Sequence, residues 1–407
     1  MQPRVRLALS VEEARGRLTQ HLTPKRSRTL PITSLAGLVL AEDVAAPFEI
    51  PRFTNSAMDG FAVRAVETRA ASEAIPVRLV VLGSLEAGEM WARSTEPASA
   101  VRISTGAAIP NGYDAVIPAE LVESIDDTIL VIEPVSPGQH VRPIGEDIQE
   151  GALAVPAGSY VRAQEIGLLA ALGFETALAI EAPTISVLSI GPELLTTGKP
   201  APVPDANGPM LAAQAVRARG TVNRVARSSG DRSALGDQLE ALGSESDLVI
   251  ASGGISDSRA DTMAALLASN RQAELWNVRL RPGKHFGVGL FDHATVLALP
   301  GNPVAAYIGF ELFGRLAIDL IAGRPINTDR FIARAVDPFD GAPGRTDAIR
   351  AHVSVDAGGQ LCVSPTRRRG SGIVSSLLEA NCLALLPESV ERVEVGDVVE
   401  IRWAGSQ

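Results

Sequence analysis

Between Thr184 and Gly323 the sequence alternates short apolar strands with helices, and this alternation constrains the fold more than any other feature. Apolar, β-branched runs occur at 184–190, 247–252 and 294–300. Helical patterns follow or separate them at 210–220, 231–243, 260–269 and 304–323. Parallel strands need long crossover connections, which are usually helical. We therefore expect a doubly wound α/β domain with a parallel sheet that helices cover on both faces.

The rest of the chain reads as β-rich modules with two further helices. Ser10 and Glu13 have the spacing of a capping box, which predicts a helix at 10–20. Residues 163–172 have helical spacing and end at a glycine. From about 75 to 140, β-branched runs alternate with Gly, Pro and Asn turns, so we expect a compact β module there. After Pro325 the β pattern returns, which indicates a small barrel or sheet.

Composition limits the classes of function. The chain has 37 Lys and Arg against 47 Asp and Glu, a formal charge of -10, and only 4% aromatic residues. A field of this sign repels nucleic acid, so we expect no nucleic-acid partner. No apolar run approaches the ~18 residues of a membrane span, the N-terminus lacks a signal-peptide core, and two cysteines fit a reducing compartment. We expect a cytoplasmic protein in which local groups must hold any anionic ligand.

Three turns follow strands at the sheet edge where open parallel sheets bind ligands. They lie at 191–193, 252–254 and 301–302. Ser252, Gly253 and Gly254 can offer successive amide donors ahead of a helix, which suits an oxyanion, although an isolated glycine pair is more often a tight turn. No dinucleotide fingerprint or P-loop is present. Three such turns on one edge predict an anionic ligand.

A basic segment follows one of the strands. Arg281 and Lys284, with Arg279 nearby, flank a Pro-Gly turn that brings the charges toward the strand ends. Such residues either face solvent or form a phosphate site. The five histidines have no metal-ligand spacing, and His285 is the one closest to a proposed site.

Four acidic residues lie at predicted turns or ahead of predicted helices. Asp59 and Asp147 either cap turns or serve as metal ligand and base. Asp231 and Asp261 precede helical runs and are most simply N-caps. From the residues themselves, these alternatives stay open.

Taken in order, these segments resemble the molybdopterin molybdenumtransferase (MoeA) family, which includes the E domain of gephyrin. The matching stretches are FTNSAMDGFAVRA, RISTGAAIPNGYDAVIPAE, VRPIGEDIQEGALAVPAGSYVRAQEIGLLAALG, LVIASGGIS, RPGKHFGVG, LALPGNPVAA and SSLLEANCLALLP. They cover almost the whole chain in family order. The combination of NSAMDG, GED, SGG and LPGNP is very specific as a set.

The resemblance implies a homodimer of four-domain subunits. Residues 1–46 plus 146–180 would form an interrupted mixed α/β domain around an inserted β-rich domain at 47–145. Residues 181–326 would form the molybdopterin-binding α/β domain, similar to molybdopterin adenylyltransferase, and 327–407 a C-terminal β domain. The resemblance also implies molybdopterin adenylyltransferase as a candidate partner.

The implied reaction inserts molybdate into adenylylated molybdopterin, with Mg²⁺ assistance and release of AMP. Carried over residue by residue, the resemblance implies catalytic roles for Asp59, Asp147 and Glu193. It implies metal ligation by Asp59, Glu193, Asp231 and Asp261. It implies substrate binding by Thr105, Arg142, Asn207, Ser252, Gly253, Gly254, Arg281, Lys284, Pro300, Pro303 and Ser371. The family's cleft lies at the dimer interface, so Asp59 and its neighbours would face the α/β domain of the other subunit.

The sequence departs from the family pattern at several of these turns. Pro192 replaces a carboxylate of the usual TGDEL, Asp257 appears where GGVSVG is usual, Gly230 replaces one acid of a frequent pair, and Asn277 stands where lysine is often seen. These departures motivate an alternative function, that of a catalytically weakened paralogue acting as a gephyrin-like scaffold or protein-binding module. A generic nucleotide-binding transferase is disfavoured because no recognised nucleotide loop is present.

Overall fold

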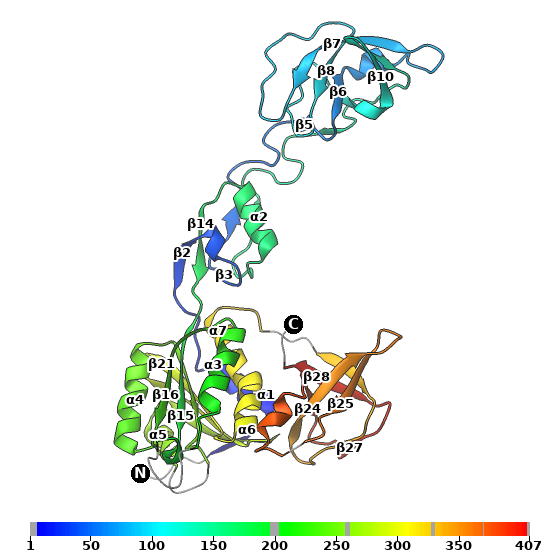
Figure 1. The fold of residues 1–407 in the computed structure, drawn as a ribbon. Coiled ribbons are helices and arrows are strands. Elements are labelled where there is room, and N and C mark those ends of the chain that lie inside the picture. Colours follow the sequence, from blue (N-terminus) through cyan, green and yellow to red (C-terminus); the bar gives the residue numbers. More distant parts are fainter. Residues whose placement is uncertain (1–5, 196–202, 257–260, 327–329, 369, 405–407) are drawn as a thin grey trace. The chain divides into compact units, whose positions relative to one another are not determined.

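The computed structural model describes residues 6–195, 203–256, 261–326, 330–368 and 370–404, which divide into two compact units (Figure 1). Unit 1 gathers residues 1–41, 158–162 and 176–407, and unit 2 gathers 42–157 and 163–175. Among the residues described, none of the helices has the length and apolar character needed to cross a membrane.

A seven-stranded sheet forms the centre of unit 1. Its spatial order is β1 (Leu7–Leu9), β18 (Ala273–Val278), β20 (His285–Phe291), β21 (Ala294–Leu299), β17 (Leu248–Ser252), β15 (Thr184–Ile190) and β16 (Thr221–Ser228). The last four of these strands are parallel to one another. β15, β17 and β21 are almost wholly buried, because helices cover both faces of the sheet.

Two layers of helices cover this sheet (Figure 1). One layer contains α1 (Val11–Thr19), α3 (Asn207–Arg217), α6 (Pro303–Gly309), a π-helical turn (Phe310–Gly314) and α7 (Arg315–Ile321). The other contains α4 (Arg232–Ser244) and α5 (Thr262–Ser269). The doubly wound α/β domain is confirmed, and the long helix predicted at 304–323 is present with a π turn inside it.

The sheet differs from the prediction in one respect, because it is mixed and not wholly parallel. β20 runs antiparallel to both of its neighbours, β18 and β21. A two-residue hairpin, Asp292 and His293, joins β20 to β21, and such a short connection can link only antiparallel strands. The sequence of β20 contains Gly287 and Gly289, which weaken the strand signal.

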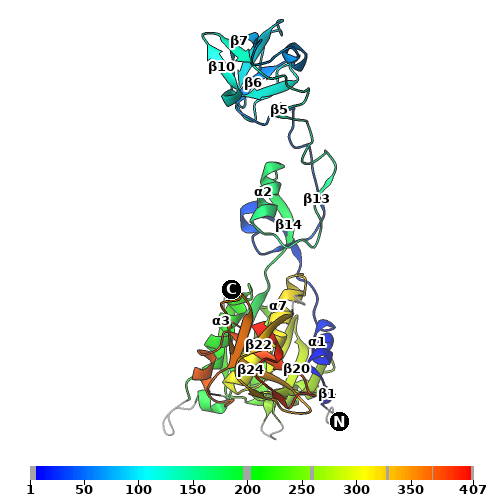
Figure 2. The same ribbon diagram turned by 90° about the vertical axis from the view of Figure 1, so that its right-hand side faces the viewer.

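The N-terminal segment also belongs to this sheet. β1 pairs in parallel with β18, and α1 follows it directly (Figure 2). The capping box is confirmed, because Ser10 Oγ accepts from the Glu13 amide at 3.1 Å and Glu13 Oε2 accepts from the Ser10 amide at 2.6 Å. Such a cap contributes about 1 kcal/mol. Ala14 and Leu18 are fully buried in the α/β core, so the first helix packs on the α/β layer.

Unit 1 also contains a three-stranded sheet and a closed barrel. The sheet has the order β2 (Ser27–Pro31), β14 (Thr176–Ile180) and β3 (Val39–Leu40). The barrel consists of β24 (Thr346–Val355), β25 (Leu361–Pro365), β22 (Phe331–Ala335), β28 (Val398–Trp403) and β26 (Cys382–Leu386). It closes because β24 pairs with both β25 and β26. The prediction of a C-terminal barrel or sheet is confirmed.

A short strand joins the barrel to the α/β domain. β19 (Leu280–Arg281) follows β18 and pairs in parallel with the beginning of β24. Smaller elements complete the barrel: β23 (Phe339–Asp340), β27 (Arg392–Val393) and a 3₁₀ turn at Val374–Leu377. The α/β domain and the barrel are therefore continuous through the backbone of 278–281.

Unit 2 is built around a six-stranded sheet. Its order is β10 (Val122–Ile125), β11 (Thr128–Val131), β7 (Val77–Leu85), β8 (Ser99–Ile103), β6 (Gly60–Val63) and β9 (Ala115–Pro118). Two short ladders precede and follow it, β5 (Asn55–Ser56) with β12 (Val141–Arg142) and β4 (Val44–Ala45) with β13 (Leu153–Val155). The helix α2 (Ala163–Ala171) also lies in this unit. The predicted β module and the predicted second helix are both confirmed.

Candidate functional site

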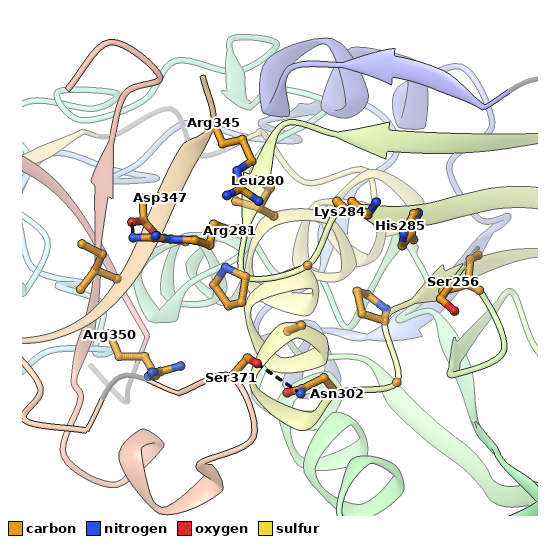
Figure 3. Close-up of a pocket in the computed structure, with 18 of the residues that line it drawn as sticks. Ser256, Leu280, Arg281, Lys284, His285, Asn302, Arg345, Asp347, Arg350 and Ser371 are labelled. Carbon is orange, nitrogen blue, oxygen red and sulfur yellow. Dashed lines mark hydrogen bonds and ion pairs between the residues drawn. The ribbon is translucent and has the colours of Figure 1, made fainter. Parts of the chain in front are cut away.

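A cavity of about 820 Å³ lies in unit 1 where the α/β domain meets the barrel (Figure 3). On the α/β side, its walls are the segments that follow β17 and β21 and the turn between β19 and β20. On the other side, its walls are the first half of β24 and residues near Ser371. The cavity therefore lies at the carboxyl ends of parallel strands, where open α/β sheets bind their ligands, and its volume suits a small organic molecule.

A buried hydrogen-bond network shapes the α/β wall. The Asn207 amide nitrogen donates to Ser252 Oγ at 2.9 Å and to the Gly301 carbonyl at 2.8 Å. The Ser252 hydroxyl donates to the Pro300 carbonyl at 2.9 Å. Asn207 and Ser252 are both buried behind the cavity lining. They hold the turn that follows β21 in place, whereas Pro300 itself lines the cavity and Pro303 begins α6 beside it.

The glycine turn after β17 is packed against backbone. Gly253 has φ +105°, and a Cβ there would lie 2.2 Å from the carbonyl oxygen of Ile190. Its amide donates to the Leu299 carbonyl at 3.1 Å, so this donor serves the fold and not a ligand. Gly254 lines the cavity. Of the three residues predicted to bind an oxyanion through successive amides at 252–254, only Gly254 lines the cavity.

The two basic residues of the predicted phosphate segment have different surroundings. Arg281 forms an ion pair with Asp347, a buried residue of β24, directly across the β19–β24 ladder. Arg279, two residues earlier, donates through Nε to both carboxylate oxygens of Glu388, at 2.9 and 2.8 Å. Lys284 is exposed on the cavity wall. Arg281 thus ties the barrel to the α/β domain, and Lys284 provides charge to the cavity.

Arg350 of β24 is a cavity residue that the sequence analysis missed. Its side chain lies on the cavity wall and points toward Ser371 (Figure 3). The residue is only 5% exposed, and burial lowers the pKa of its guanidinium, an effect that nearby Asp347 opposes. Its Nη2 donates to two carbonyls, those of Arg368 and Gly370, at a long 3.4 Å each. Its Nε is buried and has no hydrogen-bond partner among the residues that the structure describes.

An incompletely paired buried cation is costly unless a ligand completes its shell. The sequence of β24, TDAIRAHVSV, alternates polar and apolar residues, so the pattern alone did not single out Arg350. Among the residues that the structure describes, four basic side chains line the cavity against three acidic ones: Arg281, Lys284, Arg345 and Arg350 against Asp261, Asp340 and Asp347. The described lining is therefore locally cationic, in a chain of net charge -10.

Two polar residues meet across the cavity from opposite domains. Asn302, after β21, donates to the Ser371 hydroxyl of the barrel side at 3.4 Å (Figure 3). Ser371 is one of the predicted substrate-binding residues, whereas Asn302 was predicted only as part of the turn at 301–302. Both line the cavity and can exchange this long bond for one to a ligand.

The acidic residues predicted in the α/β domain are placed differently from one another. Asp261 stands at the N-cap position of α5 and lines the cavity, but its carboxylate accepts from the Ser256 hydroxyl and makes no capping bond. Asp231 is confirmed as an N-cap, because Oδ1 accepts from the Ala234 amide at 3.0 Å. Glu193 is exposed on a 3₁₀ turn (Pro192–Leu194). Neither Asp231 nor Glu193 lines the cavity. Asp257 lies outside the described residues.

In unit 2, Asp59 is held in a specific arrangement. The following Gly60 packs so closely that a Cβ would lie 2.1 Å from the Ile117 carbonyl oxygen. Asp59 Oδ1 accepts from the Thr105 amide at 2.7 Å and from the Thr105 hydroxyl at 2.8 Å. These two bonds, the backbone bond first, lower the pKa of Asp59. The carboxylate is exposed and does not cap its own turn; it binds a residue of a distant loop instead.

Arg142 belongs to β12, and Asp147 lies in the bend that follows it. Arg142 is opposite Asn55 in the β5–β12 ladder, four positions before Asp59. Asp147 donates its amide to the Ile50 carbonyl at 2.9 Å. Both side chains are exposed. Across the described residues of both units, no three His, Cys, Asp or Glu side chains gather in a way that could hold a metal ion.

Comparison with known proteins places this geometry in a family. The model of the MoeA N-terminal region (domain I and II) matches residues 9–173, that of a probable molybdopterin binding domain matches 186–319, and that of the MoeA C-terminal region (domain IV) matches 333–402. Molybdopterin molybdenumtransferase 1 of Mycobacterium tuberculosis (strain H37Rv) is 31% identical over 419 residues, covering 97% of this chain and 98% of that protein. Molybdopterin molybdenumtransferase of Haemophilus influenzae is 32% identical over 400 residues, with 97% and 98% covered.

A solved structure agrees. The molybdopterin biosynthesis moeA protein from Pyrococcus horikoshii OT3 superposes with a TM-score of 0.81 at 27% identity, covering 97% of this chain and 99% of that one. The resemblance inferred from the sequence motifs is confirmed over nearly the full length. The chain belongs to the molybdopterin molybdenumtransferase (MoeA) family.

Proposed function

We propose that this protein is a molybdopterin molybdenumtransferase of molybdenum cofactor biosynthesis. In the proposed reaction it takes adenylylated molybdopterin and molybdate, transfers molybdenum to the dithiolene and releases AMP. The observation that carries the proposal is the cationic cavity with the under-coordinated guanidinium of Arg350 in its wall. Full-length relatives with this name at 31% and 32% identity support it.

Within the cavity, we assign the binding of oxyanions to the residues with unsatisfied or exposed donors. Arg350 and Lys284 supply positive charge, and Ser371 and Asn302 supply neutral donors from the two sides. Donors fixed in place before the ligand arrives stabilise a developing negative charge at little reorganisation cost. Asn207, Ser252 and Gly253 act on binding indirectly, by holding the wall.

The proposed divalent ion needs few ligands from the protein. Mg²⁺ is usually bound by one or two carboxylates together with waters and substrate phosphates, so the lack of a three-residue cluster among the described side chains does not conflict with it. Asp261 would hold the ion at the cavity, because it is the one proposed metal ligand that lines it. When bound, the ion would neutralise phosphate charge during cleavage of the phosphoanhydride. Asp231 is less suited, since its carboxylate caps α4.

In unit 2, we propose that Asp59 acts as an ionised carboxylate. Its two bonds from Thr105 keep it charged at neutral pH and fix its direction. Arg142 and Asp147 are proposed to assist on the same unit, and Glu193 on unit 1. We further propose a cytoplasmic homodimer, with molybdopterin adenylyltransferase as a candidate donor of substrate.

The test is release of AMP by the purified protein. Wild type is incubated with adenylylated molybdopterin, Mg²⁺ and molybdate, and AMP is measured by chromatography. We expect molybdate-dependent release that Arg350→Gln reduces at least about tenfold, which corresponds to roughly 1.4 kcal/mol of binding or barrier. Arg334→Gln is the matched control, since Arg334 is an exposed arginine of the same barrel. A folded wild type that releases no AMP in the presence of molybdate would overturn the proposal and favour the scaffold.

A cellular test addresses Asp59. Wild type is expected to restore molybdoenzyme activity to a host that lacks its own molybdenumtransferase, and Asp59→Ala is expected not to. Equal rescue by both would remove Asp59 from the mechanism without affecting the proposal for the cavity.

A further inference from the structure

Ser56 of unit 2 is a fully buried residue to which neither the family resemblance nor the proposed function gives a role. It ends β5, three residues before Asp59 (Figure 1). The residue is 0% exposed, and its hydroxyl donates to the Met58 carbonyl at 2.6 Å and accepts from the Met58 amide at 3.3 Å. A hydroxyl buried this completely must be hydrogen-bonded, because leaving it unpaired costs free energy. Here both of its bonds close the turn that leads into Asp59.

The backbone of Ser56 is bonded to the loop that carries Thr105. The Ser56 amide donates to the Ala107 carbonyl at 3.0 Å, and the Ser56 carbonyl accepts from the Gly106 amide at 2.8 Å. These two bonds reach the residues that directly follow Thr105. Ser56 therefore holds the loop through its backbone and the turn before Asp59 through its side chain, so it sets the position of one relative to the other.

On its other side, Ser56 contacts the strand that carries Arg142. Ser56 is opposite Val141 in the β5–β12 ladder, and the Ala57 amide donates to the His140 carbonyl at 2.9 Å. Arg142, which is proposed to assist the reaction, is the next residue of β12. Ser56 thus lies between two segments that each carry a proposed site residue, and its side chain holds the turn before a third.

The backbone that follows Asp59 is fixed independently of Ser56. The Asp59 carbonyl accepts from the Ala119 amide at 3.1 Å, and a Cβ at Gly60 would lie 2.1 Å from a backbone carbonyl oxygen. The direction of the carboxylate therefore depends on the turn before it. The two bonds that Thr105 donates to this carboxylate, at 2.7 and 2.8 Å, weaken steeply when their geometry is bent.

We propose that Ser56 is the positioning residue for Asp59, because its hydroxyl closes the turn that directs the carboxylate at Thr105. This inference rests on the proposed function, since that function gives Asp59 its role. Ser56 itself is buried and does not touch the substrate. Without its hydroxyl, Asp59 is still present, but its carboxylate is no longer held in line with the two donors of Thr105.

The experiment follows the carboxyl carbon of Asp59 by NMR while the full-length Ser56→Ala protein is titrated with acid. The two bonds from Thr105 lower the pKa of Asp59, and no charged neighbour among the described residues contributes to this. The titration therefore reports on these bonds. In Ser56→Ala the pKa of Asp59 should rise toward its ordinary value, because both bonds are weakened. Ser56→Cys keeps a weaker donor and acceptor at the same place and should give an intermediate rise.

Ser99→Ala is the matched control for a role in stability alone. Ser99 lies in β8 of the same unit and is 1% exposed, and its hydroxyl bonds the Glu96 carbonyl at 2.5 Å and the Tyr113 hydroxyl at 2.8 Å. Both alanine variants remove a buried hydroxyl with two bonds, so both should lower the melting temperature. Only Ser56→Ala should move the Asp59 titration. An unchanged titration in Ser56→Ala, or an equal shift in both variants, would overturn the inference.

Release of AMP separates this inference from the proposed function. Ser56→Ala should lower kcat several-fold, whereas Ser99→Ala should keep the wild-type kcat at a temperature where both are folded. A Ser56→Ala protein whose Asp59 titration is shifted but whose kcat is that of wild type would remove Asp59 from the proposed mechanism and leave its positioning by Ser56 in place. An unshifted titration with a lowered kcat would contradict the positioning and not the proposed function.

Discussion

Asn207 and Ser252 are joined by a 2.9 Å hydrogen bond from Nδ2 to Oγ, and together they hold the carbonyls of Gly301 and Pro300. Asn207 begins α3 and Ser252 ends β17, so the bond connects two segments that stand 45 residues apart in the chain. Both were expected to bind substrate. Because both side chains are buried, we infer that they hold the cavity wall at Pro300 and Gly301 in place and do not contact the ligand.

Ser252→Ala is expected to destabilise the protein by about 1–3 kcal/mol, because it leaves buried polar groups of Asn207 and Pro300 without their partner. Urea unfolding followed by circular dichroism measures this change. Ser269→Ala is the control, since Ser269 is exposed at the end of α5 and bonds only within its own turn. An equal, small loss in both variants would mean that the network does not support the wall.

Thr105→Val is expected to raise the pKa of Asp59 only part of the way to its ordinary value. The substitution removes the hydroxyl bond but keeps the amide bond, which is the larger cause of the lowered pKa. Because the folded-state pKa lies below the unfolded one, the two bonds contribute stability above the unfolded pKa, and that stability is lost as the pH falls through the folded pKa. The effect on stability is small for an exposed carboxylate.

NMR titration of the Asp59 carboxyl carbon measures this shift directly. Thr128→Val, in β11 of the same unit, should leave the Asp59 titration unchanged. The assignment of the hydroxyl bond fails if Thr105→Val titrates like wild type.

Gly253→Ala and Gly236→Ala should change stability in opposite directions. At Gly253 the backbone has φ +105° and a Cβ would lie 2.2 Å from a carbonyl oxygen, so we expect a loss of about 2 kcal/mol or more. Gly236 lies inside α4, where a Cβ meets nothing closer than 4.0 Å, so alanine should stabilise the protein by about 0.5–1 kcal/mol. Thermal unfolding of both variants tests the pair, and a neutral Gly253→Ala would contradict the close packing after β17.

The two cysteines should differ in reactivity toward a thiol reagent. Burial raises the pKa of Cys382 to about 12, and its thiol donates to the Ala351 carbonyl inside the barrel, so it should not react in the native protein. Cys362 is partly exposed on β25 and should be modified first. Mass spectrometry after brief alkylation should show one adduct in native protein and two in denaturant. A native double adduct would indicate that the barrel opens readily.

Much of the fold follows from periodicity and end signals that are local in sequence. The Ser10–Glu13 capping box, the helix of 163–171 and the parallel strands β15, β17 and β21 were predictable in this way. β20 was missed because Gly287 and Gly289 lower the strand signal, and its antiparallel direction follows from a two-residue connection that only the structure reveals.

The candidate site was harder to predict because its residues come from segments that are far apart in the sequence and meet only in the folded chain. Lys284 and Ser371 were found through motifs, and both line the cavity. Arg350 was missed because a single arginine in a strand usually faces solvent; here it lies opposite Leu383 of β26 in the closed barrel and is only 5% exposed. The role of Arg281 changed for the same reason, since its partner Asp347 is 66 residues away.

The ladder between β19 and β24 is only two residue pairs long, yet it determines where the chemistry can occur. A shortened chain that ended before β22 would retain the sheet, the glycine turn and Lys284, but it would lack Arg350 and Ser371. One side of the pocket would then be open to solvent. Substitutions in the barrel can therefore change one wall of the pocket while the α/β sheet stays as it is.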